Sequence, residues 1–297
     1  MSAVRASKLF VILIFLSSAV SYAQLSRSAV SVAGSDTNPC TTTSPCRSIG
    51  VALTQTNAGG EVIVLDSAGY GAFAVSKSVS VQAAPGVYAG VTTPSGYGVT
   101  VNAGSSDTVV LRGLTVNGLG TADGGIGFGG PGARLFVENC VIQNFVNFGI
   151  LTFYKIMVTD TTVRNCAIGI SVDNAGGPVV GTIDHVVVVG ASTAGIQSFR
   201  NANVTVSNSS VHSSGTGFFA NYGILNMESC LSSNNTTGVM SQNGAAVNIS
   251  DTMTTGNSVG WSINTTNPAS VIRSCGNNKT GGNGTNVIGT PASITLQ

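Results

Sequence analysis

One phrase recurs along this chain at intervals of 21 to 25 residues. Each copy has an aliphatic anchor, usually Asn, Asp or Ser two places later, and a Gly followed by a hydrophobic residue about a dozen positions downstream. The anchors are Val137, Val158, Ile183, Val206, Met227 and Ile249, with a weaker seventh at Ile272; the downstream pairs begin at Gly149, Gly169, Gly195, Gly217, Gly238 and Gly260. Two markers that stay in phase predict a stacked repeat architecture.

The residues between the markers decide which repeat this is. A period in the low twenties suits a leucine-rich repeat or a β-solenoid, and there is no leucine ladder. Residues 204–221 are typical, with short β-branched runs of alternating polarity broken by Asn, Ser and Gly, a pattern that predicts short strands and turns. Such strands cannot bury an apolar face alone, so each coil must stack on the next. The sequence therefore predicts an all-β fold, a parallel β-helix.

A second column of residues predicts a repeated turn. Seven places after the anchors are Asn144, Asn165, Gly190, Ser213, Asn234 and Gly256, mostly residue types that tolerate positive φ. Coils about 4.8 Å apart would let the Asn side chains bond to one another. We interpret this column as structural.

Composition limits the location and the partners. The continuous repeat favours one elongated domain, and only 8% of its residues are charged, against about 25% in an average globular protein. Residues 1–23 have basic residues, the apolar run Leu9–Leu16 and a small-residue cleavage site, which predicts a signal peptide. Loss of Arg5 and Lys8 would lower the formal charge from +1 to −1, so we expect no nucleic-acid partner.

We expect the mature chain to begin at Gln24 and to be secreted, periplasmic or extracellular. The apolar run is shorter than the ~20 residues that span a bilayer, so no membrane insertion is expected after cleavage. We also expect a monomer.

The cysteines divide into two kinds. Cys40 and Cys46 lie in a short loop flanked by Pro39 and Pro45, and an exported chain favours a disulfide between them. Three places after the anchors are Cys140, Cys230 and Cys275, which we interpret as small core residues. Neither the cysteine spacing nor the two histidines predict a metal site.

The ends of the solenoid need covering, because an open end exposes strand edges and core. Residues 24–60 are expected to form an amino-terminal cap, with the Cys40–Cys46 turn and a short amphipathic helix over Arg47–Gln55. The parallel β-helix is expected over 61–280 and a loop-like carboxyl-terminal tail over 281–297.

The entry segment carries a family resemblance. Residues 34–47, then 59–66 with Gly69-Tyr70-Gly71, resemble the start of bacterial right-handed parallel β-helix repeat proteins of the pectin-lyase-like superfold. With the coils, the resemblance covers about residues 30–280. It implies a right-handed helix, but this superfold carries lyases, hydrolases, esterases and adhesins, so it does not imply one activity.

The known catalytic signatures of the superfold are missing. A hydrolase needs two carboxylates, and the Asn-x-Asp, Asp-Asp, Gly-His-Gly and Arg-x-Lys strings of polygalacturonases do not occur. A lyase of the pectate type needs an acidic calcium cluster, whereas the 11 acidic residues here are scattered. We expect no cofactor, with calcium entering only if the chain is a lyase.

One string is similar to a lyase motif. Thr182-Ile183-Asp184-His185 resembles the Trp-Ile-Asp-His of pectate lyases without its Trp. The candidate catalytic residues are therefore Asp160, Arg164, Asp184 and His185, which neighbouring coils could bring together for acid–base chemistry. The alternative is a hydrogen-bond ladder along a turn edge, since equivalent places hold Asn139, Asn208, Ser229 and Asp251.

Equivalent places after the third strand of each coil carry sugar-binding residue types. The candidate substrate-binding residues are Tyr154, Asp173, Phe199, Arg200 and Tyr222. Rings stack on sugar faces, while amides and carboxylates bond to hydroxyls. The alternative is that these rings cover a loop or fill the core.

The function that fits these observations is a secreted, non-catalytic β-helix that binds an extracellular or surface polysaccharide or serves adhesion. One alternative is a polysaccharide lyase or glycoside hydrolase acting on an acidic glycan. Another is a structural spacer.

Overall fold

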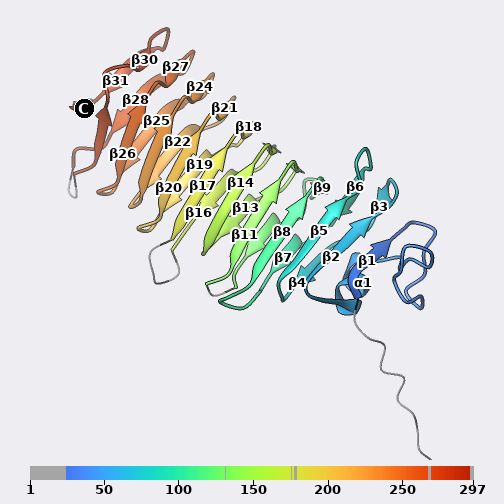
Figure 1. Ribbon diagram of the computed structural model, residues 1–297. Coiled ribbons are helices and arrows are strands. Elements are labelled where there is room, and N and C mark those ends of the chain that lie inside the picture. The colour runs from blue at the N-terminus through green and yellow to red at the C-terminus, as the bar shows by residue number, and fades with distance from the viewer. Residues whose placement is uncertain (1–24, 131, 175, 177–178, 267–268, 295–297) are drawn as a thin grey trace, which may run out of the picture.

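The computed structural model describes residues 25–130, 132–174, 176, 179–266 and 269–294. The expected signal peptide lies outside these residues. Within them the strands form three parallel sheets of 12, 10 and 10 strands. Figure 1 shows the coils stacked along one axis from α1 to the carboxyl-terminal strands. The predicted parallel β-helix with a short amino-terminal helix is confirmed.

Apart from the first and the last strand, which both belong to sheet A, each coil contributes one strand to each sheet in turn. Sheet A holds β1 (Leu25–Val30), β2 (Thr56–Val64), β5 (Val79–Ala83), β8 (Thr108–Arg112), β11 (Arg134–Glu138), β14 (Lys155–Thr159), β17 (Val180–Asp184), β20 (Asn203–Ser207), β23 (Ile224–Glu228), β26 (Ala246–Ser250), β29 (Val271–Ser274) and β32 (Ala292–Ser293). Sheet B holds β3 (Ala68–Gly69), β6 (Ala89–Thr92), β9 (Leu114–Asn117), β12 (Val141–Gln143), β15 (Thr162–Arg164), β18 (Val187–Val189), β21 (Ser210–His212), β24 (Leu231–Ser233), β27 (Met253–Thr255) and β30 (Lys279–Thr280). Sheet C holds β4 (Phe73–Val75), β7 (Tyr97–Val101), β10 (Gly124–Phe128), β13 (Phe148–Thr152), β16 (Ile168–Val172), β19 (Ala194–Phe199), β22 (Thr216–Asn221), β25 (Thr237–Gln242), β28 (Val259–Ile263) and β31 (Thr285–Ile288).

The register follows the sequence repeat up to the last coil. All six anchors from Val137 to Ile249 pair in one column of sheet A. The seventh anchor is wrong, because Ile272 pairs with Val247 and Ser274 takes the place opposite Ile249. Strand β29 buries one residue deeply where β26 buries two, so a hydrophobic pattern alone could not fix its register. Cys275 therefore does not share the place of Cys140 and Cys230.

The predicted turn column has the expected backbone. Asn144, Asn165, Gly190, Ser213, Asn234 and Gly256 all have φ between 51° and 70°. The Asn165 amide donates to Asn144 at 3.0 Å, and the Asn144 amide donates to Asn117 at 3.1 Å. The ladder of asparagine side chains is thus confirmed for the three consecutive coils that hold Asn117, Asn144 and Asn165, at the bend between sheets B and C.

The stacked glycines of sheet C mark a place with no room for a side chain. A Cβ on Gly149 would lie 2.5 Å from the carbonyl oxygen of Gly169, and one on Gly169 would lie 2.5 Å from that of Gly195. Each glycine lets the backbone of the next coil approach closely, which explains why Gly precedes the buried hydrophobic residue in every copy.

The amino-terminal cap consists of α1 (Ile49–Gln55) and a disulfide-closed loop. Ser48 caps the helix, and α1 buries Ile49, Ala52 and Leu53. A disulfide joins Cys40 and Cys46, with Cα atoms 4.6 Å apart, as predicted. The parallel β-helix was expected over residues 61–280, but its sheets extend past both limits. At the amino-terminal end β1 pairs with β2, and at the carboxyl-terminal end β31 and β32 pair with β28 and β29.

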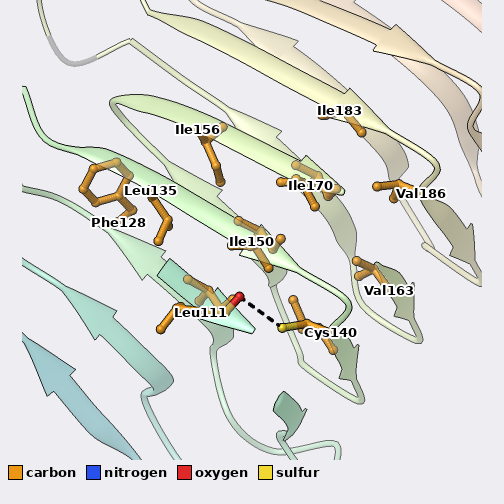
Figure 2. Close-up of a cluster of buried hydrophobic side chains, with 14 of the residues drawn as sticks. Leu111, Phe128, Leu135, Cys140, Ile150, Ile156, Val163, Ile170, Ile183 and Val186 are labelled. Atoms are coloured by element: carbon orange, nitrogen blue, oxygen red, sulfur yellow. Dashed lines mark hydrogen bonds between the residues drawn. The ribbon is translucent and has the colours of Figure 1, made fainter. Parts of the chain in front are cut away.

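Inward side chains from the three sheets form one continuous core. Figure 2 shows part of it, with Leu111, Leu135, Ile150, Ile170 and Ile183 pointing into the interior of the solenoid. The buried Cys140 thiol donates to the Leu111 carbonyl at 3.6 Å (Figure 2). Because apolar side chains fill the interior here, the chemistry of the chain lies on the outer faces and in the turns.

Candidate functional site

The outer end of sheet C gathers a group of predicted binding residues. Pairing of Thr152 with Val172 and of Val172 with Ser198 places Phe153, Asp173 and Phe199 in one column, and Phe199 pairs directly with Asn221. The next position along the chain forms a second column that contains Tyr154, Arg200 and Tyr222. The predicted equivalence of these places is confirmed. We call Asp173, Phe199, Arg200, Asn201 and Tyr222 the binding strip.

An ion pair organises the strip. Asp173 and Arg200 are 27 residues apart but lie on consecutive coils, and Arg200 Nε donates to Asp173 Oδ1 at 2.7 Å while Nη2 donates to Oδ2. Asp173 also accepts from the Asn174 backbone N–H at 2.6 Å. Its side chain is only 7% exposed, against 53% for Arg200. The carboxylate hydrogen bonds and charge raise the pKa of Arg200.

Two aromatic rings lie beside this pair. The Arg200 guanidinium carbon is 5.1 Å from the centroid of the Phe199 ring, and the Phe199 and Tyr222 centroids are 6.3 Å apart with the rings tilted by 58°. Arg200, Asn201 and Tyr222 have φ of 44°, 64° and 60°. This backbone turns the chain at the end of the sheet and leaves Tyr222 50% exposed.

The strip borders an open depression. Asn174, Gly176, Phe199, Arg200, Asn201 and Tyr222 line a hollow of about 490 Å³. Gly176 and Asn201 were not identified from the sequence, although their place after the ends of sheet C strands could have indicated them. The hollow is thus lined by two rings, side-chain amides and one guanidinium, which are groups that can stack on or donate to a polar ligand.

Tyr154 does not join this group. It is packed against the core as a partly buried residue, and its ring meets Phe128 edge-on at 5.8 Å. The sequence alternative, that a ring in this column covers the core, applies to Tyr154. Toward the carboxyl terminus the strip is continued by uncharged side chains. Asn243, on the next coil, donates a hydrogen bond from its side-chain amide to Asn221 at 2.8 Å.

The candidate catalytic residues lie elsewhere, along the bend between sheets A and B. Asp160 and His185 occupy the same turn position on consecutive coils, with φ of 50° and 52°. Arg164 ends β15, four residues beyond Asp160. Within the described part of the chain, no hydrogen bond or ion pair joins the side chains of Asp160 or Arg164 to Asp184 or His185. The structure therefore brings together only part of the predicted set.

Asp184 is held by its neighbours in a ladder. Its carboxylate accepts from Ser207 at 2.7 Å and from Asn208 at 2.9 Å, and it bonds to His185 Nδ1 at 2.8 Å. The hydrogen bond from Ser207, followed by that from Asn208, lowers the pKa of Asp184 to about 2. A carboxyl group with this pKa is a weak base and is ionised at neutral pH, so it is poorly suited to general acid–base catalysis.

Another hollow, of about 320 Å³, lies on the same bend in the last coils. Its lining includes Ser229, Asp251 and Lys279 but no aromatic residue.

Among the described residues, no group of three His, Cys, Asp or Glu side chains is placed to hold a metal ion. No helix within the described ranges is both long and apolar enough to cross a membrane. The binding strip is therefore the candidate site.

Comparisons with known proteins agree on the fold. No protein-family model and no curated protein matches the sequence. Among solved structures, the chain is similar to a pectate lyase, Pel9A, with TM-score 0.67 and 15% identity over 89% of this chain and 78% of that one. It is similar to an alginate lyase from Paenibacillus sp., with TM-score 0.64 and 12% identity over 91% and 100% of the two chains.

A rhamnogalacturonan lyase is also similar, with TM-score 0.54 and 13% identity over 91% of this chain and 84% of that one. At these identities the likeness concerns the fold alone. The chain thus has the right-handed parallel β-helix fold that these lyases have, which is the fold that the entry segment predicted.

Proposed function

We propose that this protein is an exported, non-catalytic glycan-binding β-helix and that the binding strip is its glycan site. The observation that carries the proposal is the exposed Tyr222 ring beside Phe199 and the Arg200–Asp173 pair at the rim of an open depression. The similar structures named for polysaccharide lyases support a glycan as the ligand class.

The strip offers both kinds of contact that a sugar makes. Apolar faces of pyranose rings stack on aromatic side chains, and hydroxyl groups bond to amides and guanidinium N–H groups. Tyr222 and Phe199 supply the rings, while Arg200 and Asn201 supply donors. Because the depression is open, it suits a chain lying across the solenoid better than an enclosed small molecule.

The ionisable groups of the strip favour binding over turnover. Hydrolysis of a glycosidic bond needs two carboxyl groups flanking that bond, and Asp173 is the one carboxylate among the described strip residues. It is nearly buried and bound to Arg200. Since Asp173 also raises the pKa of Arg200, that guanidinium is a poor proton acceptor for a lyase step.

The disulfide supports a location outside the cytoplasm. Bridges such as Cys40–Cys46 form and persist in oxidising compartments. This agrees with the signal peptide predicted for residues 1–23 and with an extracellular glycan as partner.

Affinity gels containing neutral or acidic polysaccharides test the proposal. We expect retardation by at least one polysaccharide, and we expect Tyr222→Ala to weaken it about 10-fold, which corresponds to about 1.4 kcal/mol. Tyr88→Ala is the matched control, because Tyr88 is 51% exposed against 50% for Tyr222 and does not line the depression. Equal effects of the two variants would refute the assignment of the site.

The same samples test the catalytic alternative. Absorbance at 235 nm reports unsaturated products of a lyase, with and without calcium. Product formation that disappears in Asp184→Asn would favour a lyase at the bend between sheets A and B and would overturn the non-catalytic proposal.

A further inference from the structure

We infer that the binding strip selects uncharged glycans and that Asp173 enforces this selection. The inference rests on the proposed function of the strip. It differs from what the lyase-like fold suggests, because pectate and alginate are polyanions.

The charges of the strip cancel. Arg200 is the one charged residue among those that line the depression, and both nitrogens of one edge of its guanidinium are bound to the carboxylate of Asp173. The two columns continue with Asn221, Tyr222 and Asn243, which carry no charge. A ligand on this strip therefore meets a surface with no net charge.

An acidic sugar would meet an Arg200 guanidinium that is already bound to the carboxylate of Asp173. A carboxylate binds a guanidinium best through two parallel N–H···O bonds, and Asp173 already occupies the edge formed by Nε and Nη2. The remaining edge, which includes Nη1, attracts a second carboxylate only weakly, because the charge of Asp173 offsets that of the guanidinium. Displacing Asp173 would leave a carboxylate that is 7% exposed without its cation, and an unpaired buried charge is strongly unfavourable. If Asp173 stays in place, its negative charge repels the incoming uronate.

A neutral sugar meets no such obstacle. Its apolar face can contact Phe199 and Tyr222, and its hydroxyls can accept from Asn201 or from Nη1 of Arg200, which the ion pair does not use. The ion pair also fixes the guanidinium over the Phe199 ring. Asp173 thus acts as a positioning residue that orients Arg200 and removes its attraction for anions.

The test compares sugars that differ only in charge. Uronate hexasaccharides and their carboxyl-reduced counterparts, which keep the same backbone, are titrated into the full mature chain by calorimetry at 25 and 250 mM NaCl. For the wild type we expect the reduced sugars to bind at least about 10-fold more tightly than the uronates, with little dependence on salt.

Removing the carboxylate charge should reverse part of this preference. In Asp173→Asn the guanidinium is no longer neutralised, so we expect uronate affinity to rise about 10-fold at low salt and to lose that gain at high salt. Affinity for the reduced sugars should not rise, because the loss of the carboxylate adds no attraction for an uncharged ligand and loosens the hold on Arg200. Asp184→Asn removes the same charge at the bend between sheets A and B and should leave both affinities unchanged.

The outcomes separate this inference from the proposed function. Wild-type protein that binds uronates as well as or better than the reduced sugars, with binding lost in Arg200→Ala, would overturn the selectivity and leave glycan binding at the strip intact. Binding of neither set, together with no retardation on any polysaccharide gel, would overturn the proposed function itself. If Asp173→Asn does not fold, the wild-type preference and its salt dependence still decide the question.

Discussion

Replacing Gly169 by alanine tests the stacking that builds the solenoid. The added Cβ would lie 2.5 Å from the carbonyl oxygen of Gly195 and 2.6 Å from a methyl carbon of Val188, where ordinary contacts exceed 3.4 Å. The oxygen belongs to backbone paired on both sides within sheet C, so it cannot move without disturbing the next coil. Overpacking of this kind costs about 1–3 kcal/mol.

The net loss in the free energy of unfolding should lie near the lower end of that range. Alanine restricts the unfolded chain more than glycine does, which returns about 0.5–1 kcal/mol. Gly169 does not have a positive φ, so the penalty comes from contact and not from the backbone angle. We expect a net decrease of about 1 kcal/mol in the free energy of unfolding.

Urea unfolding measures this quantity. Circular dichroism follows the strands, and fluorescence follows Trp261, the single tryptophan of the chain, which is buried in sheet C. Coincident transitions would justify a two-state analysis. Gly50→Ala is the control, since a Cβ there meets no atom within 4 Å and lies in α1, where alanine is the better helix former. A loss below about 0.5 kcal/mol in Gly169→Ala, or one equal to that of the control, would refute the stacking argument.

Two further predictions concern titratable groups. The folded pKa of Asp184, about 2, is below its usual 3.8, so its contribution to stability is present above about pH 4 and is lost as the pH falls toward 2. In acid unfolding, the free energy of unfolding should therefore fall less over this pH window in Asp184→Asn than in the wild type. Identical curves would contradict the hydrogen-bond ladder around Asp184. Burial raises the pKa of the thiols of Cys140, Cys166 and Cys230 to about 11, whereas Cys275 is partly exposed. Iodoacetamide at pH 8 should therefore add one adduct to the native chain, as measured by intact mass. Rapid labelling of all four thiols would contradict the burial of the other three.

Much of the fold could be predicted because the repeat consists of residues that each meet a local requirement of the backbone. Glycine at the close approach of sheet C and asparagine at the positive-φ turns each satisfy a requirement of the backbone that recurs in every coil. The Cys40–Cys46 loop is equally local. Where the periodic signal weakens, prediction fails: β29 offers one buried residue, and Ile272 was assigned to the wrong column.

The candidate site was predictable only as a column. Equal spacing from the markers placed Tyr154, Arg200 and Tyr222 at equivalent turns, but it could not say which rings point inward. Tyr154 packs on Phe128, while Tyr222 stays half exposed beside Phe199. Side-chain direction in an irregular turn depends on local φ and on neighbouring coils, and neither is encoded in the period.

By itself, then, the sequence determined the period, the turn columns and the parallel β-helix, because these follow from backbone requirements that single residues meet. Only the tertiary structure decided that Asp173 neutralises Arg200 on the next coil. It also decided that, within the described residues, no hydrogen bond or ion pair joins the side chains of Asp160 and Arg164 to those of Asp184 and His185. Side-chain contacts between coils depend on the length, direction and burial of each side chain in three dimensions, and the period of the sequence does not specify them.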